Sequence, residues 1–310
     1  MSLFYSADGR VRVGWRFLIS VVVVLLANGI AIEVALALAG RHDRIVEAIY
    51  RPLTMILLLA GFSFLLITAD HIEAEPRTAM GLAFDQFWLR DALLGMLIGG
   101  GMIALAVAAM LTASVALRFN LKLTWRTTEL AALELFILAT GAMAEELMFR
   151  GYPFQRLIEA TGPARAVILL SVLFGAVHLQ NPHSSRWAFI NTIAVGVLFA
   201  IAYLKTRALW LPWGIHFGWN TALGLIFGLP VSGLNDFSVV VRTTARGPVW
   251  LTGGAYGLEA SALGTLIICL GLVVVSLLKL GREAESRIRS QAALSVTPAA
   301  HSPSTNSIQL

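Results

Sequence analysis

Apolar residues along this chain are gathered into long stretches that short polar segments separate. A helix that crosses the hydrocarbon core of a bilayer needs about 20 consecutive, mainly apolar residues. Eight stretches qualify or nearly qualify, at about residues 15–39, 51–69, 91–117, 129–149, 164–179, 187–204, 207–227 and 259–280. The pattern therefore predicts an all-α, polytopic transmembrane helical bundle of about eight spans, with no β-sheet.

The composition supports a chain solvated by lipid and excludes several other classes. Hydrophobic residues make up 57% of the sequence and charged residues 13%, whereas soluble domains average about 45–50% apolar and 25% charged. The net charge is +5, and the sequence has no basic run with interleaved aromatics, which argues against a nucleic-acid partner. We expect the positive residues to lie in loops beside lipid headgroups. The single cysteine, Cys269, excludes an intrachain disulfide and a cysteine metal cluster.

The two termini are predicted to lie in the cytoplasm. The first apolar stretch follows three arginines, as in a signal peptide, but it exceeds the apolar run of about 7–15 residues that signal peptides carry. We therefore expect an uncleaved first span. With eight spans both termini lie on one side, which then holds fourteen of the 23 Lys and Arg residues, and positive charge favours the cytoplasmic side.

The same pattern divides the chain into four regions. Residues 1–128 contain about three N-terminal spans, and residues 129–233 contain the spans that carry ionisable groups. Residues 234–281 comprise a loop and the last predicted span. Residues 282–310 are polar and rich in Ser, Thr and Pro, which predicts a disordered tail.

Two adjacent carboxylates, Glu145 and Glu146, stand near the end of the fourth predicted span. An ionisable residue inside a span costs about 2.5–3.5 kcal/mol, so such residues are kept mainly where they function or pair. Glu146 and Arg150 are four residues apart and can form an ion pair on one helix face. Glu145 is rotated about 100° from Glu146 and has no obvious cation partner, which leaves it free for chemistry. The alternative is a charge cluster that only reaches toward the headgroups.

Histidines follow in two later spans. Phe174 and His178 lie four residues apart, so that the phenyl ring can pack against the imidazole, although a lone histidine at a helix end is often structural. His216 and Asn220 share one face of the seventh span, where both side chains need buried partners.

Spacing predicts that Glu145 and His178 meet. Glu145 lies 16 residues before Thr161, and His178 lies 16 residues after Gly162, on either side of a turn. In an antiparallel helical hairpin these equal separations place the two side chains at about the same depth in the membrane.

This set of side chains suits amide hydrolysis by an activated water. Glu145, held by His178, could act as a general base toward water. His216 and Asn220 could donate hydrogen bonds to the developing oxyanion. Two histidines and a glutamate could instead bind Zn²⁺, although no His-Glu-x-x-His helix is present.

Three motifs in this order resemble the CPBP intramembrane proteases, which include the type II CAAX prenyl endopeptidases and bacteriocin-processing and self-immunity proteins. The motifs are Glu-Glu-x-x-x-Arg at 145–150, Phe-x-x-x-His at 174–178 and His-x-x-x-Asn at 216–220. The stretches 209–212 and 228–233 are similar to bacterial members, which implies a bacterial plasma membrane. The resemblance covers about residues 130–233, so region 129–233 is expected to be a CPBP-like catalytic core.

The resemblance implies roles for the matching residues. Glu145 and His178 would activate water, His216 and Asn220 would stabilise the oxyanion, and Glu146, Arg150 and Phe174 would support the site. Family members have been described both as glutamate-dependent and as metal-dependent enzymes. We expect no cofactor; if zinc is bound, its ligands would be Glu145, His178 and His216. The implied substrate is a membrane-associated peptide or protein, which is lipidated in some members.

Two other classes of function remain open. A transporter could also place Glu, His and Arg in its spans, but it should have charges along a pathway and internal repeats, and the sequence has neither. A membrane immunity or scaffold protein without catalysis would keep the fold and tolerate loss of Glu145 or His178.

Overall fold

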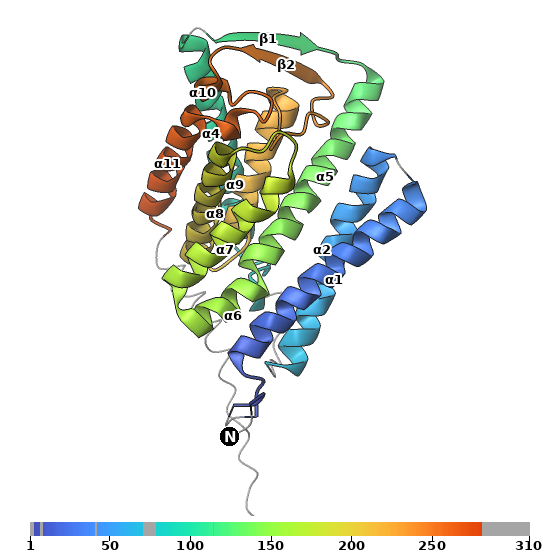
Figure 1. The fold of residues 1–310 in the computed structure, drawn as a ribbon, viewed down its shortest axis with the longest axis vertical. Helices are drawn as coiled ribbons and strands as arrows, with labels where there is room; N and C mark the ends of the chain where they lie inside the picture. Colours follow the sequence, from blue (N-terminus) through green and yellow to red (C-terminus); the bar gives the residue numbers. More distant parts are fainter. Residues whose placement is uncertain (1–2, 7–8, 41, 71–78, 114, 281–310) are drawn as a thin grey trace, which may run out of the picture.

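The fold is a bundle of helices with a small sheet at one end (Figure 1). The computed structural model describes residues 3–6, 9–40, 42–70, 79–113 and 115–280, so the predicted tail lies outside the described residues. The α-helices and strands of the described residues are α1 (Val13–Ala39), α2 (Asp43–Thr68), α4 (Trp88–Thr112), β1 (Ala116–Leu121), α5 (Trp125–Arg150), α6 (Tyr152–Thr161), α7 (Pro163–Val177), α8 (Arg186–Thr206), α9 (Trp210–Thr221), β2 (Val241–Arg246), α10 (Val249–Thr252) and α11 (Ala262–Leu277). Short helical turns span His178–Gln180, Ala222–Ile226 and Leu258–Ala260.

Each of the eight predicted apolar stretches corresponds to a helix. They are, in order, α1, α2, α4, α5, α7, α8, α9 with the turn that follows it, and α11. Within the described residues, five helices are long and apolar enough to cross a membrane, namely α1, α2, α4, α7 extended to Gln180, and α8. The chain is therefore an integral membrane protein with an all-α bundle, while the count of eight spans stays a prediction.

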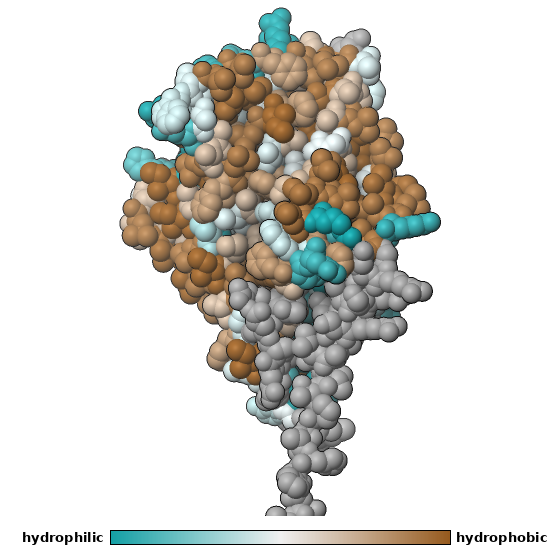
Figure 2. Space-filling model, turned by 180° about the vertical axis from the view of Figure 1, so that it is seen from behind, coloured by the Kyte–Doolittle hydropathy of each residue, from teal (hydrophilic) through white to brown (hydrophobic). Residues whose placement is uncertain are grey.

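The outer surface fits this assignment. Large apolar side chains are exposed along α1, α4, α7 and α11, among them Leu25, Leu97, Ile168 and Leu266. The view from behind the molecule shows a surface that is largely hydrophobic outside its polar patches (Figure 2). Exposed apolar area of this extent is expected where the solvent is lipid.

The prediction of no β-sheet was wrong. Strands β1 and β2 pair antiparallel, with Arg118 opposite Thr244 and Asn120 opposite Arg242. The sheet lies at the end of the bundle opposite the N-terminus (Figure 1). Its first strand follows the apolar end of α4 almost directly, and its partner lies far along the chain, so no local hairpin signal was available.

The predicted hairpin between the fourth and fifth spans is broken by an extra helix. Helix α5 ends at Arg150, and α6 follows with Pro153 in its first turn. A Cβ atom at Gly151 would collide with the carbonyl oxygen of Leu147, so the bend requires glycine there. Helix α6 is therefore a separate segment that connects α5 to α7.

Close backbone packing positions α9, the helix that carries His216 and Asn220. Glycines line the contact between α4 and α9. A Cβ atom at Gly95 would lie 2.5 Å from the Leu211 carbonyl oxygen, and one at Gly218 would lie 2.5 Å from that of Met96. Small residues let membrane helices approach in this way, which sets the position of α9 against α4.

An ionic cluster around the buried carboxylate of Asp70 connects the N-terminal helices to α6. Arg16 of α1 forms ion pairs with Asp70, just after α2, and with Glu159 of α6, the latter at 2.7 Å. Arg156 of α6 also pairs with Asp70 at 3.0 Å. Asp70 is only 1% exposed. These pairs hold α1 and α2 beside the segment of the chain that carries the ionisable motifs.

Candidate active site

A cavity of about 560 Å³ lies between α1, α2, α5, α7, α8 and α9, with the loop after α9 forming a further wall. Its lining is mostly apolar. Four residues that sequence analysis selected for chemistry line it together, namely Glu145, His178, His216 and Asn220. The sequence therefore identified side chains that three different helical segments bring to one place.

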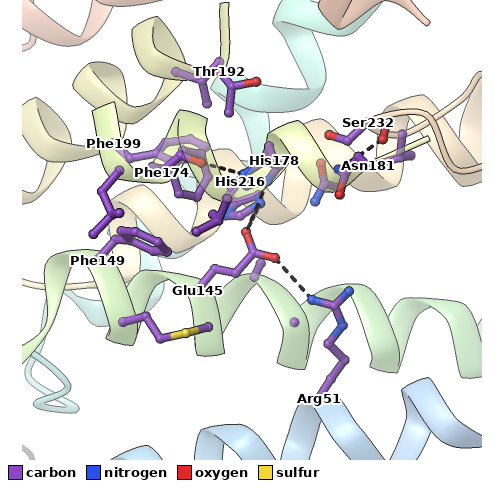
Figure 3. Close-up of a pocket in the computed structure, with 18 of the residues that line it drawn as sticks. Arg51, Glu145, Phe149, Phe174, His178, Asn181, Thr192, Phe199, His216 and Ser232 are labelled. Carbon is purple, nitrogen blue, oxygen red and sulfur yellow. Dashed lines mark hydrogen bonds and ion pairs between the residues drawn. The ribbon is translucent and has the colours of Figure 1, made fainter. Parts of the chain in front are cut away.

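Glu145 lies at the centre of this group (Figure 3). Its Oε2 atom is 3.7 Å from Nε2 of His216 and 4.0 Å from Nε2 of His178. Both distances exceed a direct hydrogen bond and are compatible with a bridging water. The Oε2 atom is buried and has no hydrogen-bond partner within the described chain.

His178 is held at the C-terminal end of α7. Its Nδ1 atom lies 2.7 Å from the carbonyl oxygen of Phe174. A carbonyl only accepts, so Nδ1 carries a hydrogen, and Nε2 is the ring nitrogen that faces Glu145. The Phe174 ring packs against the imidazole with centroids 4.5 Å apart, as expected from their spacing on the helix.

His216 is fixed between a carboxylate and an aromatic ring. Its Nδ1 atom is 3.0 Å from Oε1 of Glu146, and its imidazole stacks on Phe199 with centroids 4.8 Å apart. Asn220 lies one helical turn later and lines the same cavity. The Nδ1–H group of His216 therefore donates to Glu146, and Nε2 faces Glu145.

The expected ion pair between Glu146 and Arg150 is present and buried. Arg150 Nη1 lies 3.5 Å from Glu146 Oε1, and the two residues are 1% and 0% exposed. Nη2 of Arg150 donates to the carbonyl oxygen of Gly196 at 2.9 Å. The guanidinium also lies 4.7 Å from the ring centroid of Phe174 and 5.2 Å from that of Phe199. Arg150 thus links α5 to α8 and to the rings that pack against both histidines.

The expectation that Glu145 has no cation partner was wrong. Arg51 of α2 donates from Nη1 to Glu145 Oε1 at 3.2 Å and from Nε to Glu47 Oε2 at 2.6 Å. Arg51 also lines the cavity (Figure 3). Sequence reasoning missed it because only the Glu47–Arg51 spacing on one helix hints at an ionic role, and nothing in the sequence links α2 to Glu145.

A second carboxylate, Glu259, lines the cavity outside the predicted motifs. Its Oε1 accepts from Nε1 of Trp219 at 3.0 Å, and its Oε2 accepts from the amide and the hydroxyl of Ser232. Ser232 has a left-handed backbone, with φ of 49°. Glu259 therefore holds the loop after α9 against the helix that bears His216.

The segment that carries Glu145, His178, His216 and Asn220 is similar to known proteins. Residues 127–222 match the family model described as "Type II CAAX prenyl endopeptidase Rce1-like". This segment is therefore similar to that family over about a third of the chain. The matched segment contains Glu145, His178, His216 and Asn220, whereas Arg51 and Glu259 lie outside it.

A curated relative agrees with this assignment. Over 81 residues the chain is 35% identical to "Putative membrane peptidase YdiL" of Bacillus subtilis (strain 168). The aligned part covers 26% of this chain and 31% of that relative. The similarity therefore extends over about a quarter of this chain and about a third of the relative's length.

Proposed function

We propose that this membrane protein is an intramembrane endopeptidase that hydrolyses a peptide bond in a membrane-associated peptide or protein. The observation that carries the proposal is the geometry around Glu145 Oε2. This buried, unpartnered oxygen faces two imidazole Nε2 atoms at 3.7 and 4.0 Å. Three polar atoms at such distances can hold one water molecule, which is the nucleophile that amide hydrolysis requires.

In the proposed mechanism Glu145 and His178 bind the two hydrogens of this water. Glu145 removes a proton as the water oxygen attacks the carbonyl carbon of the substrate. The same proton then passes to the amine as the carbon–nitrogen bond breaks. The products are a carboxylic acid and an amine, and Glu145 returns to its ionised form.

His216 and Asn220 are proposed to stabilise the oxyanion. Ion pairs join three glutamates and two arginines beside His216, namely Glu47, Glu145, Glu146, Arg51 and Arg150. With a hydrogen on each ring nitrogen, His216 would donate to Glu146 from Nδ1 and toward the substrate from Nε2. His216 Nε2–H and the Asn220 amide could then donate to the oxygen on which negative charge develops.

Zinc is the alternative to this metal-free mechanism. Both imidazoles donate from Nδ1 to a fixed acceptor, as zinc-bound histidines do. However, among the described residues no group of three or more His, Cys, Asp or Glu side chains is arranged to hold a metal ion. The Arg51 guanidinium, 3.2 Å from Glu145, also disfavours a second cation there. We therefore propose that the residues act without a metal.

Chelation separates these two mechanisms. After prolonged dialysis of the purified protein against a strong zinc chelator, a metal-free site should keep its peptidase activity, measured on a membrane peptide that the protein cleaves. Activity that vanishes and returns on addition of zinc would instead assign Glu145, His178 and His216 as ligands.

The mostly apolar cavity walls and the similarity to a bacterial membrane peptidase support a lipid-embedded substrate in a bacterial plasma membrane. Cytoplasmic termini remain part of this proposal. A lipidated substrate would place its chain along the apolar side chains that α1 and α7 contribute to the cavity, such as Val21, Val24 and Leu173.

Comparative proteomics tests the proposed function. Membranes from cells with the wild-type protein should contain cleaved membrane peptides that are absent when Glu145→Gln replaces it at equal abundance. Identical peptide patterns in the two strains would favour a membrane immunity or scaffold protein without catalysis.

A further inference from the structure

Arg51 is the one residue of α2 that this structure shows bonded to the proposed general base. Its guanidinium joins two carboxylates, Glu47 on its own helix at 2.6 Å and Glu145 on α5 at 3.2 Å. The side chain is only 23% exposed. A planar guanidinium presents several N–H donors in a fixed geometry, so a contact with two carboxylates restrains its position.

Helix α5 leaves room for Arg51 one turn before Glu145. A Cβ atom at Gly141 would lie 3.2 Å from Cδ of Arg51, closer than ordinary van der Waals contact. Glycine at this position therefore lets the arginine side chain pass along α5 and reach the carboxylate. This close fit is an observation separate from the ion pair. It shows that the contact between α2 and α5 leaves space for the Arg51 side chain at Gly141.

We propose that Arg51 is a positioning residue that holds Oε1 of Glu145 so that Oε2 faces His178 and His216. A carboxylate rotates about its terminal bond unless its oxygens are held. With Oε1 bound by Arg51, Oε2 is directed into the space between the two imidazoles (Figure 3). The role rests on the proposed function, because it matters only if Glu145 acts on a water.

The inference extends the active site beyond the residues that match the family model. Arg51 lies on α2, whereas the family match covers residues 127–222. The N-terminal helices then contribute to turnover through one side chain. Their contact with α5 orients the base as well as stabilising the bundle.

The test measures kcat and KM of purified, full-length Arg51→Gln and Arg51→Lys on a cleaved membrane peptide. Misplacement of a reacting group by about 1 Å can cost about 10²-fold in rate. Arg51→Gln should therefore lower kcat by about 10–100-fold, with KM within about twofold of wild type. Lysine keeps the charge but not the fork of donors, so Arg51→Lys should recover part of the loss.

Arg44→Gln is the matched control. Arg44 also lies on α2 and also pairs with a buried glutamate of α5, Glu134, at 3.3 Å, but neither residue lines the cavity. This variant should keep the wild-type kcat. Gly141→Ala provides a second probe that keeps Arg51 and favours the helix, and its added methyl group should lower kcat without lowering thermal stability.

The outcomes distinguish this role from the proposed function. Wild-type kcat in Arg51→Gln, with an active wild-type protein, would overturn the positioning role alone. Equal losses in Arg51→Gln and Arg44→Gln, with equal falls in melting temperature, would reduce Arg51 to a structural link between α2 and α5. A wild-type protein that cleaves none of the membrane peptides would overturn the proposed function and this role with it.

Discussion

Glu145→Gln should abolish peptidase activity and leave a folded, detergent-stable protein. The amide keeps the shape of the side chain, and its oxygen can still accept the hydrogen bond that Arg51 donates at 3.2 Å. It cannot take a proton from water as a carboxylate does. Activity on a membrane peptide and melting temperature in detergent, measured on the same preparation, test both halves of this expectation.

Glu134→Gln is the control for the loss of a buried carboxylate from α5. Glu134 is 1% exposed and pairs with Arg44, but it does not line the cavity, so this variant should keep its turnover.

His178→Ala should lower peptidase activity nearly as much as Glu145→Gln. Asn220→Ala should retain residual turnover, because one oxyanion donor commonly contributes about 10²–10³ in rate. Full activity of purified Glu145→Gln would rule out Glu145 as either base or essential ligand.

Arg150→Ala should reduce the amount and stability of folded protein, not only turnover. The change leaves Glu146, which is 0% exposed, without its guanidinium partner and removes the bond to the Gly196 carbonyl. Removing one partner of a buried ion pair costs about 3–5 kcal/mol. Expression level, size-exclusion profile and melting temperature in detergent measure the effect.

Two further variants test why Arg150→Ala should lose stability. They distinguish the burial of an unpaired charge from an effect that follows the loss of any arginine. Arg165 is exposed near the start of α7, so Arg165→Ala should leave the melting temperature close to that of wild type. The double variant Glu146→Gln with Arg150→Met removes both charges and should regain part of the lost stability. Normal expression and melting temperature in Arg150→Ala would contradict a stabilising role for the pair.

Contacts within one helix could be derived from the sequence. Glu146 with Arg150, and Phe174 with His178, are four residues apart, and a period of 3.6 residues per turn brings such pairs together whatever surrounds them. The apolar stretches predicted the main helices because a helix that crosses a bilayer must be long and apolar. Both properties can be read from consecutive residues of the sequence. The motif residues themselves could be chosen because ionisable groups are costly in a span.

Contacts between distant segments were decided by the tertiary structure. The pairing of Arg51 with Glu145, the bond from His216 to Glu146 and the sheet of β1 with β2 depend on how helices rotate and cross. Neither periodicity nor composition encodes these angles. They follow from close approaches such as Gly95 against Leu211 and from the bend at Gly151, which only packing in three dimensions selects. Sequence alone therefore selected Glu145, His178, His216 and Asn220 as candidates. The packing of the helices determined which of them meet and added Arg51, because a side chain's partners across helices depend on the relative position of whole backbones.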